Sequence, residues 1–184
     1  MIVTVSGLHG TGKSTYAARI AKRLGLRHVS AGLLFRRLAK EKYLSLEEFG
    51  QLALRDPSID RLVDEETMNV AEKGDVVVDG QLAGWVLKEV ANFRIYLTAP
   101  EKVRLDRISK RDGLELREAE KETLARERVQ NERYRRHYGF DVADRTIYHM
   151  VLDTSLLPID DTAKILTVAA LAVREKLKKS PRKP

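Results

Sequence analysis

The sequence predicts an α/β fold in three layers, built on a five-stranded parallel sheet. Short apolar runs alternate with longer stretches of helical periodicity, which is the order expected of β–α–β units. The apolar runs lack polar alternation, as is typical of strands covered by helices on both faces. The chain has 184 residues, of which 43% are hydrophobic and 33% charged, and these values suit one globular domain.

The strands are expected at five segments, namely residues 2–6, 28–30, 75–79, 94–98 and 147–153. Helices fill the intervals between them. The first helix is predicted to open at Lys13. The last is predicted from about Asp161, as its N-cap, to Lys178, with lysines at the end where the helix dipole favours positive charge.

Two intervals are too long and polar to be simple crossovers, and we expect them to form helical arms over the active site. The first, residues 33–74, contains a capping box at Ser45 and Glu48 and a further helix start at Asp56-Pro57. The second lies between residues 100 and 148, and its part 100–140 holds a lid and a following charged helix, from Glu115 to about Tyr138. The expected organisation is one domain over residues 1–178, with a basic, flexible tail at 179–184.

Composition narrows the class of partner. The chain has no cysteine, which fits a cytoplasmic protein. The longest apolar run near the C-terminus, residues 165–173, is shorter than the roughly 20 residues of a membrane span. The net charge of +7 is compatible either with nucleic acid or with a polyphosphate site. We expect small-molecule partners and a monomer, with neither a membrane nor a nucleic-acid partner.

A phosphate-binding loop is the strongest motif. Residues 7–14 match Gly-x4-Gly-Lys-Ser/Thr between an apolar strand and an amphipathic helix. Glycines let backbone N–H groups face a phosphate at a helix N-terminus. Lys13 is expected to reach the β- and γ-phosphates of ATP, and the Ser14 hydroxyl to ligate Mg²⁺. The predicted donor site comprises Gly7, Leu8, His9, Gly10, Thr11, Gly12, Lys13, Ser14 and Thr15.

Asp79 is the second candidate for the metal. It closes the run Val76-Val77-Val78, at the carboxyl edge of a predicted buried strand, where open α/β sheets bind ligands. Asp79 is therefore expected to orient Mg²⁺, directly or through water. The alternative is an aspartate that only caps the next helix.

Further segments join the phosphate loop in a family pattern. They are Ser30-Ala31-Gly32-Leu33-Leu34-Phe35-Arg36, Asp79-Gly80-Gln81-Leu82-Ala83-Gly84-Trp85, Arg126 with Arg133-Tyr134, Tyr138-Gly139-Phe140-Asp141, and Val151-Leu152-Asp153-Thr154-Ser155. Together they resemble the archaeal type of cytidylate kinase, within the nucleoside monophosphate kinases of the P-loop NTPase fold. The resemblance covers nearly the whole chain.

The resemblance implies roles for particular residues. It makes 33–74 the arm that binds the nucleoside monophosphate, with Arg36 on the acceptor phosphate; a guanidinium suits that role because it holds phosphate at two points. The implied acceptor site comprises Ser30, Gly32, Arg36, Asp79, Gln81 and Gly84. The implied catalytic residues are Lys13, Arg107, Arg111, Arg126 and Arg133. For Arg128, Arg135 and Arg136 we prefer a solvated, salt-bridged helix face.

This chain departs from the family at two positions. Gln81 stands where related enzymes usually carry arginine, and Gln130 stands where they usually carry an acidic residue. Each amide can still donate and accept hydrogen bonds. The departures bear on base choice and affinity rather than on the type of reaction.

The resulting hypothesis is a kinase that transfers the γ-phosphoryl of ATP to CMP or dCMP. One alternative is the same chemistry on UMP, AMP or a small metabolite. Another is an adenylate-kinase-like ATPase acting in RNA or ribosome assembly, which only the basic tail favours. A switch GTPase is disfavoured, because the sequence has no Asn-Lys-x-Asp segment.

Overall fold

The computed structural model describes residues 1–139 and 141–179. Phe140 and the end of the predicted tail, residues 180–184, lie outside the described residues. The strands are β1 (Ile2–Gly7), β2 (Arg27–Ser30), β3 (Val76–Asp79), β4 (Phe93–Thr98) and β5 (Met150–Asp153). The helices are α1 (Lys13–Leu24), α2 (Ala31–Glu41), α3 (Leu46–Arg55), α4 (Pro57–Glu72), α5 (Ala83–Val86), α6 (Glu101–Asp112), α7 (Leu116–Tyr138) and α8 (Ile159–Lys179).

The five strands form one parallel sheet in the order β2-β3-β1-β4-β5, which confirms the predicted fold class. β1 is central, with Val5 in register with Asp79 of β3 and with Ile95 of β4. Because all strands run the same way, their carboxyl ends share one edge. The loop that follows β1 and the carboxylate that ends β3 therefore lie next to each other.

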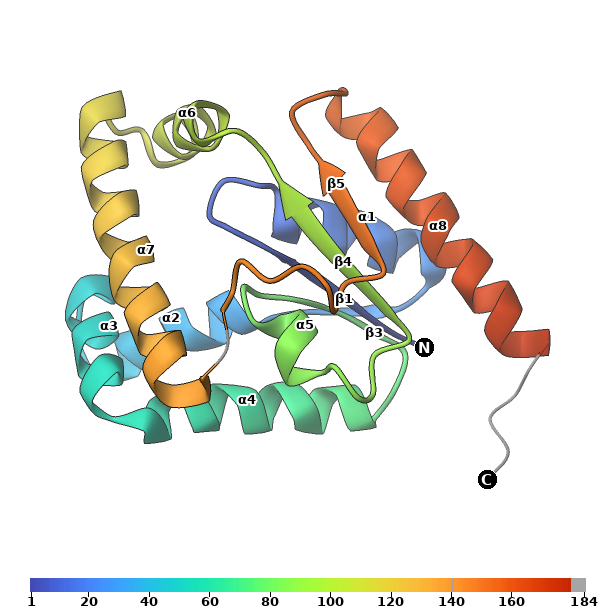
Figure 1. The fold of residues 1–184 in the computed structure, drawn as a ribbon, viewed down its shortest axis with the longest axis horizontal. Helices are drawn as coiled ribbons and strands as arrows, with labels where there is room; N and C mark the ends of the chain where they lie inside the picture. The colour runs from blue at the N-terminus through green and yellow to red at the C-terminus, as the bar shows by residue number, and fades with distance from the viewer. Residues whose placement is uncertain (140, 180–184) are drawn as a thin grey trace.

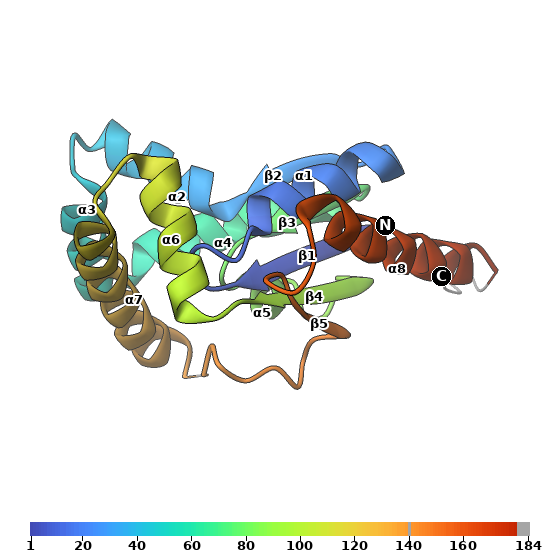
Figure 2. The same cartoon turned by 90° about the horizontal axis from the view of Figure 1, so that it is seen from above.

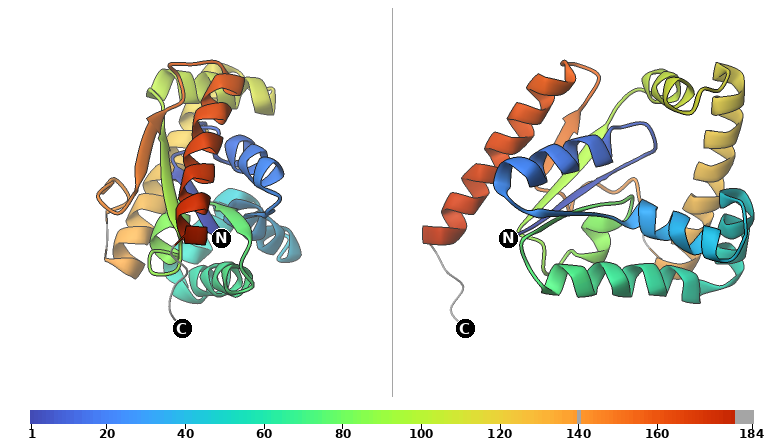
Figure 3. Two further views of the ribbon diagram at one scale, coloured as in Figure 1. Left: turned by 90° about the vertical axis from the view of Figure 1, so that its right-hand side faces the viewer. Right: turned by 180° about the vertical axis from the view of Figure 1, so that it is seen from behind.

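Helices cover both faces of the sheet, giving three layers. α1 and α8 cover one face of the sheet, the face turned to the viewer in the right-hand panel of Figure 3. There Tyr16, Ile20 and Leu166 share one apolar core with Val3 and Ile95. α4 and α5 lie on the opposite face (Figure 1). There Ala71 of α4 and Ala83 of α5 share an apolar core with Val76 and Val78 of β3. Neither face of β1 or β3 meets water: the valines of β3 form a continuous apolar run, and even the polar residues Thr4 and Ser6 of β1 are fully buried.

Two helical groups extend beyond the carboxyl edge of the sheet. α2, α3 and α4 follow β2 and share a small core around Phe49 and Ile59. α6 and α7 follow β4, and α7 runs from α6 at one end to α3 at the other, so that it stands across the carboxyl edge (Figures 1 and 2). The loop between β1 and α1 faces α7.

The helix starts predicted in the first arm are confirmed. Ser45 and Glu48 form a reciprocal capping box at α3, and Asp56 caps α4 ahead of Pro57. Two other expectations were wrong. Asp161 is not an N-cap, because α8 already begins at Ile159, where Thr162 N donates to Pro158 O at 3.0 Å.

The second error concerns the last strand, which begins at Met150 rather than at residue 147. Ile147 and Tyr148 are buried, but they pack against Tyr96 instead of pairing in the ladder. At the chain end, α8 continues to Lys179, one residue beyond its predicted end. Within the described residues, no helix combines the length and apolar character that a membrane crossing needs.

The core of the α8 layer can be tested at Leu166, which is fully buried beneath the sheet. Leu166→Ala is expected to lower the free energy of unfolding by about 2–5 kcal/mol, because it removes buried surface and leaves a cavity. The control is Val168→Ala on the same helix, where the side chain is 65% exposed; its effect should stay below about 0.5 kcal/mol. Chemical denaturation measures both, and equal effects would contradict the described packing.

Candidate functional site

Three carbonyl groups of the phosphate loop, between β1 and α1, accept hydrogen bonds from side chains outside the loop. Arg104 Nη1 donates to His9 O at 2.9 Å and Arg107 Nη1 to Gly10 O at 3.3 Å, both from α6. Thr154 Oγ1, just after β5, donates to Thr11 O at 3.2 Å. In a trans peptide the next N–H points opposite to the carbonyl. The N–H groups of residues 10–12 are therefore turned to the inside of the loop.

Two glycines are needed for this loop to fit. At Gly7 a Cβ atom would lie 2.3 Å from Leu97 O, and at Gly10 it would lie 2.5 Å from Arg104 O. Both residues also have positive φ, +145° and +77°, which side chains rarely adopt. The loop consequently packs directly on the end of β4 and on the backbone of α6.

Lys13 is the first residue of α1 and its ammonium group folds back over the loop. Its Nζ donates to Leu8 O at 2.9 Å. Burial lowers the pKa of Lys13 from 10.5 to about 8, against the opposing effects of the Asp79 and Glu127 carboxylates. A cation with so little solvation is poised to bind an incoming anion.

Ser14 and Asp79, the two residues predicted to hold Mg²⁺, contact each other. The Ser14 hydroxyl donates to Asp79 Oδ2 at 2.7 Å, and His28 Nε2 lies 3.6 Å from the same oxygen. Burial alone would raise the pKa of Asp79, but hydrogen bonds from His28, Ser14 and Ser30 hold it below its usual value. The carboxylate is therefore ionised at neutral pH.

The oxygen donors of Ser14 and Asp79 fit Mg²⁺, which prefers oxygen ligands and binds through few protein groups plus substrate phosphates. Among the described residues, no cluster of three or more His, Asp or Glu side chains is arranged to hold a metal ion on its own.

Three guanidinium groups converge near this loop from both arms. Burial, followed by the positive charges of Arg111 and Arg36, lowers the pKa of Arg126. Arg126 in turn is close enough to Lys13 to lower the pKa of that lysine. Arg111 is partly neutralised by Asp112, to which its Nε and Nη2 donate at 2.7 and 2.6 Å. The site thus concentrates positive charge around the place where loop and arms meet.

One face of α7 carries polar atoms that are buried without a partner. Arg126 Nε, Gln130 Oε1 and Arg133 Nη1 have no hydrogen-bond partner among the described residues. Their spacing of four and three residues puts all three on the same side of the helix. Buried polar groups are normally satisfied. This face therefore has the character of a surface that a polar ligand completes.

Arg133 lies deepest on that face. Its Nε is 3.1 Å from Asp60 Oδ2 on α4, and its guanidinium carbon is 4.9 Å from the centre of the Phe35 ring on α2. His137 Nδ1 also contacts Asp60 Oδ2, at 3.1 Å. Arg133 is therefore part of the contact between the two arms, with its Nη1 still unused.

The remaining predicted residues have different partners and different degrees of burial. Ser30 caps α2 and accepts from Leu33 N, while Gly32 and the exposed Arg36 occupy the next turn. Gln81 Nε2 lies 3.2 Å from His9 Nδ1. Gly84 is buried, its N donates to Ser6 Oγ at 3.0 Å, and a Cβ there would lie 2.3 Å from the Tyr148 ring. Arg107 contacts the loop carbonyl and Thr154, not the guanidinium cluster.

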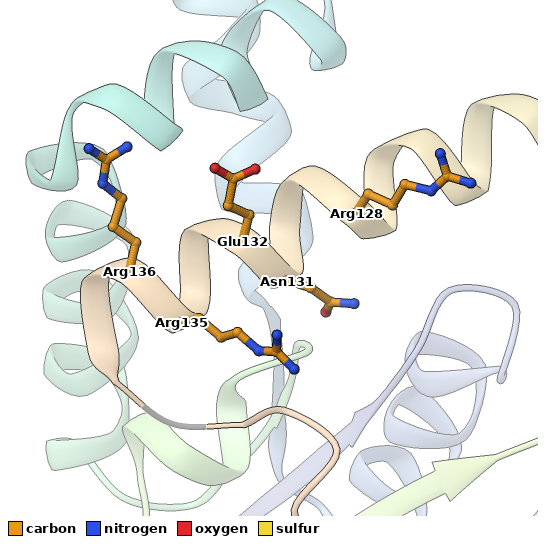
Figure 4. Close-up of a pocket in the computed structure, with 5 residues that line it drawn as sticks. All are labelled: Arg128, Asn131, Glu132, Arg135 and Arg136. Atoms are coloured by element: carbon orange, nitrogen blue, oxygen red, sulfur yellow. The ribbon is translucent and has the colours of Figure 1, made fainter.

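A hollow of about 630 Å³ lies elsewhere on α7. Figure 4 shows the side chains that line it, all of which extend from α7 alone: Arg128, Asn131, Glu132, Arg135 and Arg136. No residue of the loop or of the strand ends contributes to it. We therefore place the candidate site on the buried face of α7 and the phosphate loop, not in this hollow.

Comparison with known proteins identifies the family of this chain. The model of the cytidylate kinase-like family matches residues 2–156. The cytidylate kinase of Aeropyrum pernix is 46% identical over 166 residues, covering 90% of this chain and 96% of the relative. This chain belongs to the cytidylate kinase-like family. The cytidylate kinase of Pyrococcus horikoshii is 45% identical over 155 residues, which cover 84% of this chain and 80% of that one.

Solved structures share the fold of this cytidylate kinase-like protein. Shikimate kinase from Acinetobacter baumannii superposes with a TM-score of 0.58 at 15% identity, covering 93% of each chain. A gluconokinase from Sinorhizobium meliloti gives 0.62 at 14% identity, covering 98% of this chain and 97% of that one. At these identities the likeness supports the P-loop kinase fold alone.

Two residues of the candidate site, Thr154 and Glu127, were not predicted from the sequence. Thr154 is fully buried and bridges Thr11, Thr98 and Arg107. Glu127 is buried and bonded to His9 and Arg104. Thr154 lies inside a segment of the family pattern, and Glu127 directly follows Arg126. Nearness in sequence to these motifs was the only indication that either residue belongs to the site.

The lowered pKa of Lys13 predicts proton uptake when a triphosphate binds. At pH 8 about half of the Lys13 side chains are neutral in the ligand-free protein, because the pKa is about 8. Bound phosphate favours the ammonium form and raises this pKa, so ATP binding should take up about half a proton at pH 8 and almost none at pH 6.

Calorimetry in buffers of different ionisation enthalpy measures this uptake. The matched control is Lys13→Met, which keeps the aliphatic stem and should show no uptake assignable to this position. Equal proton uptake by the two proteins at pH 8 would contradict the assignment of Lys13 to the triphosphate.

Proposed function

We propose that this chain is a cytidylate kinase, transferring the γ-phosphoryl of ATP to CMP or dCMP to give ADP and CDP or dCDP. The observation that carries the proposal is the placement of a phosphate loop opposite a buried helix face whose polar atoms lack partners. The family relationship, at 46% identity over most of both chains, supports the choice of acceptor.

The donor half of the site is the loop at the start of α1. Inward N–H groups of residues 10–12, the helix N-terminus and Lys13 together provide donors and positive charge for a triphosphate. Mg²⁺ is proposed at Ser14 and Asp79, where it would neutralise charge on the β- and γ-phosphates. Gly7 and Gly10 keep the loop close to β4 and α6.

The acceptor half lies on α7 and α2. Arg36 and Arg126 repel each other in the ligand-free protein, and a monophosphate between them would remove that repulsion. The partnerless Oε1 of Gln130 is an acceptor suited to an exocyclic amino group, which cytosine carries and uracil does not. Arg133, fixed by Asp60, supplies a further donor on the same face.

The geometry accounts for catalysis without a general base. The attacking oxygen of a nucleoside monophosphate is already anionic, so the protein has to align two anions and offset their repulsion. We assign this role to Lys13, Arg126 and Arg111, because the charge of Arg126 acts on Lys13 and the charge of Arg111 acts on Arg126. We propose that the arms, residues 33–74 and 100–140, close over both substrates and exclude water from the transfer.

An acceptor panel at fixed ATP concentration tests the proposal. CMP or dCMP should give the highest kcat/KM, with UMP and AMP lower by about tenfold or more, because they leave the buried Gln130 oxygen without a donor of matching position. Coupled detection of ADP measures each rate. Equal or better turnover of a non-cytidine acceptor would contradict the proposed substrate, and ATP hydrolysis stimulated by RNA alone would favour the assembly ATPase.

A second prediction separates Arg36 from its neighbour. Arg36→Ala should raise the KM for the acceptor about 10- to 100-fold through loss of a charge-assisted phosphate contact, while the KM for ATP changes little. The control is Arg37→Ala, because the Arg37 guanidinium is half-exposed and pairs with Glu41 and Glu66. Steady-state kinetics with each substrate varied in turn gives both constants, and an unchanged acceptor KM in Arg36→Ala would remove that residue from the site.

A further inference from the structure

Glu127 is a buried carboxylate that the proposed reaction does not use. It lies on α7, directly after Arg126, and is only 8% exposed. Its Oε1 accepts from Arg104 Nη1 at 2.7 Å and from His9 N at 3.3 Å, and it lies 3.2 Å from His9 Nδ1. One carboxylate oxygen of the second arm thus binds both α6 and the phosphate loop.

Arg104 connects Glu127 to the carbonyl group of His9. It is 4% exposed, and the Nη1 atom that binds Glu127 also donates to His9 O at 2.9 Å. Both main-chain groups of His9 are therefore held, the N–H by the carboxylate and the carbonyl by the guanidinium. The loop is also fixed sterically, because Gly10 packs directly against the Arg104 backbone.

The His9 ring adds to the same link. Its Nδ1 lies between Glu127 Oε1 and Gln81 Nε2, each at 3.2 Å. A carboxylate only accepts hydrogen bonds. With the proton on Nδ1, the ring donates to Glu127 and leaves the Gln81 amide without an acceptor on that nitrogen.

We propose that Glu127 is a positioning residue for the phosphate loop, holding it through Arg104 and the main chain of His9 in the conformation that accepts a triphosphate. Neither Glu127 nor Arg104 needs to touch the nucleotide for this role. Because Arg126 precedes Glu127, the same turn of α7 orients the acceptor side and the donor side. The inference rests on the proposed function only in taking ATP as the donor.

A buried ion pair can also serve only to fill and neutralise space, and the test has to separate that role from positioning. Removing one partner leaves the other charge buried and destabilises the protein, whereas replacing both by apolar residues is often neutral. The variant Arg104→Met/Glu127→Leu keeps the volume but loses every bond to His9. It should unfold within about 5 °C of wild type.

The measurement is calorimetric binding of a non-hydrolysable ATP analogue with Mg²⁺, together with thermal unfolding. The double variant is expected to bind the analogue at least about tenfold more weakly, and its KM for ATP should rise while the KM for CMP changes less than about twofold. Binding within about twofold of wild type would overturn the proposal, because it would leave the pair a purely structural role. If the double variant does not fold, Glu127→Gln is judged by the same criterion below its unfolding temperature.

Glu132→Gln is the matched control, since Glu132 is an exposed glutamate on the same helix. It should bind the analogue as wild type does, and an equal loss there would overturn the proposal by tracing the effect to the overall charge of α7. Failure of the proposed function is distinguishable, because a wild-type preference for another acceptor would leave analogue binding and its dependence on Glu127 unchanged.

Discussion

The site depends on the hydrogen bonds that the carbonyls of His9, Gly10 and Thr11 accept from side chains outside the loop. Arg104, Arg107 and Thr154 supply them, from α6 and from the turn after β5. Within the loop, the side chains of Thr11 and Lys13 both donate to Leu8 O, so the carbonyls of His9, Gly10 and Thr11 must find partners elsewhere. Since the partners come from the second arm and from the end of β5, a complete phosphate site exists only when the whole domain is folded.

The same site holds charge that the ligand-free protein leaves poorly compensated. Lys13 is buried with a lowered pKa, Arg126 is crowded by other cations, and Gln130 hides an unsatisfied oxygen. Each feature disfavours the fold taken alone. They are tolerated because the three-layer core beneath, around Val5, Ile95 and Leu166, is fully buried and independent of them.

Local chemistry made the fold and the loop predictable from sequence. Apolar runs marked the strands, Ser45 with Glu48 and Asp56 with Pro57 marked helix starts, and the glycine spacing marked the phosphate loop. The family pattern then pointed to Arg36, Arg126 and Arg133. Where local patterns misled, tertiary packing was the reason: Ile147 and Tyr148 are apolar because they cover Tyr96, not because they form a strand.

Contacts between distant parts of the chain were beyond such reasoning. His9 and Glu127 are separated by 118 positions, and no spacing rule connects them. A glutamate in the charged helix 115–138 is indistinguishable from its solvated neighbours until α7 is placed against the loop. The same holds for Arg133, whose burial against Asp60 and Phe35 depends on how the two arms meet.

The acceptor and the triphosphate are expected to meet between the loop and the buried face of α7. A crystal structure of the protein with CMP and a non-hydrolysable ATP analogue would show where each of them binds. The phosphates of the analogue should lie on the N–H groups of residues 10–12 beside Lys13, with the CMP phosphate between Arg36 and Arg126 and the base at Gln130. CMP bound instead in the hollow of Arg128 and Arg135, or a triphosphate away from the loop, would contradict this arrangement.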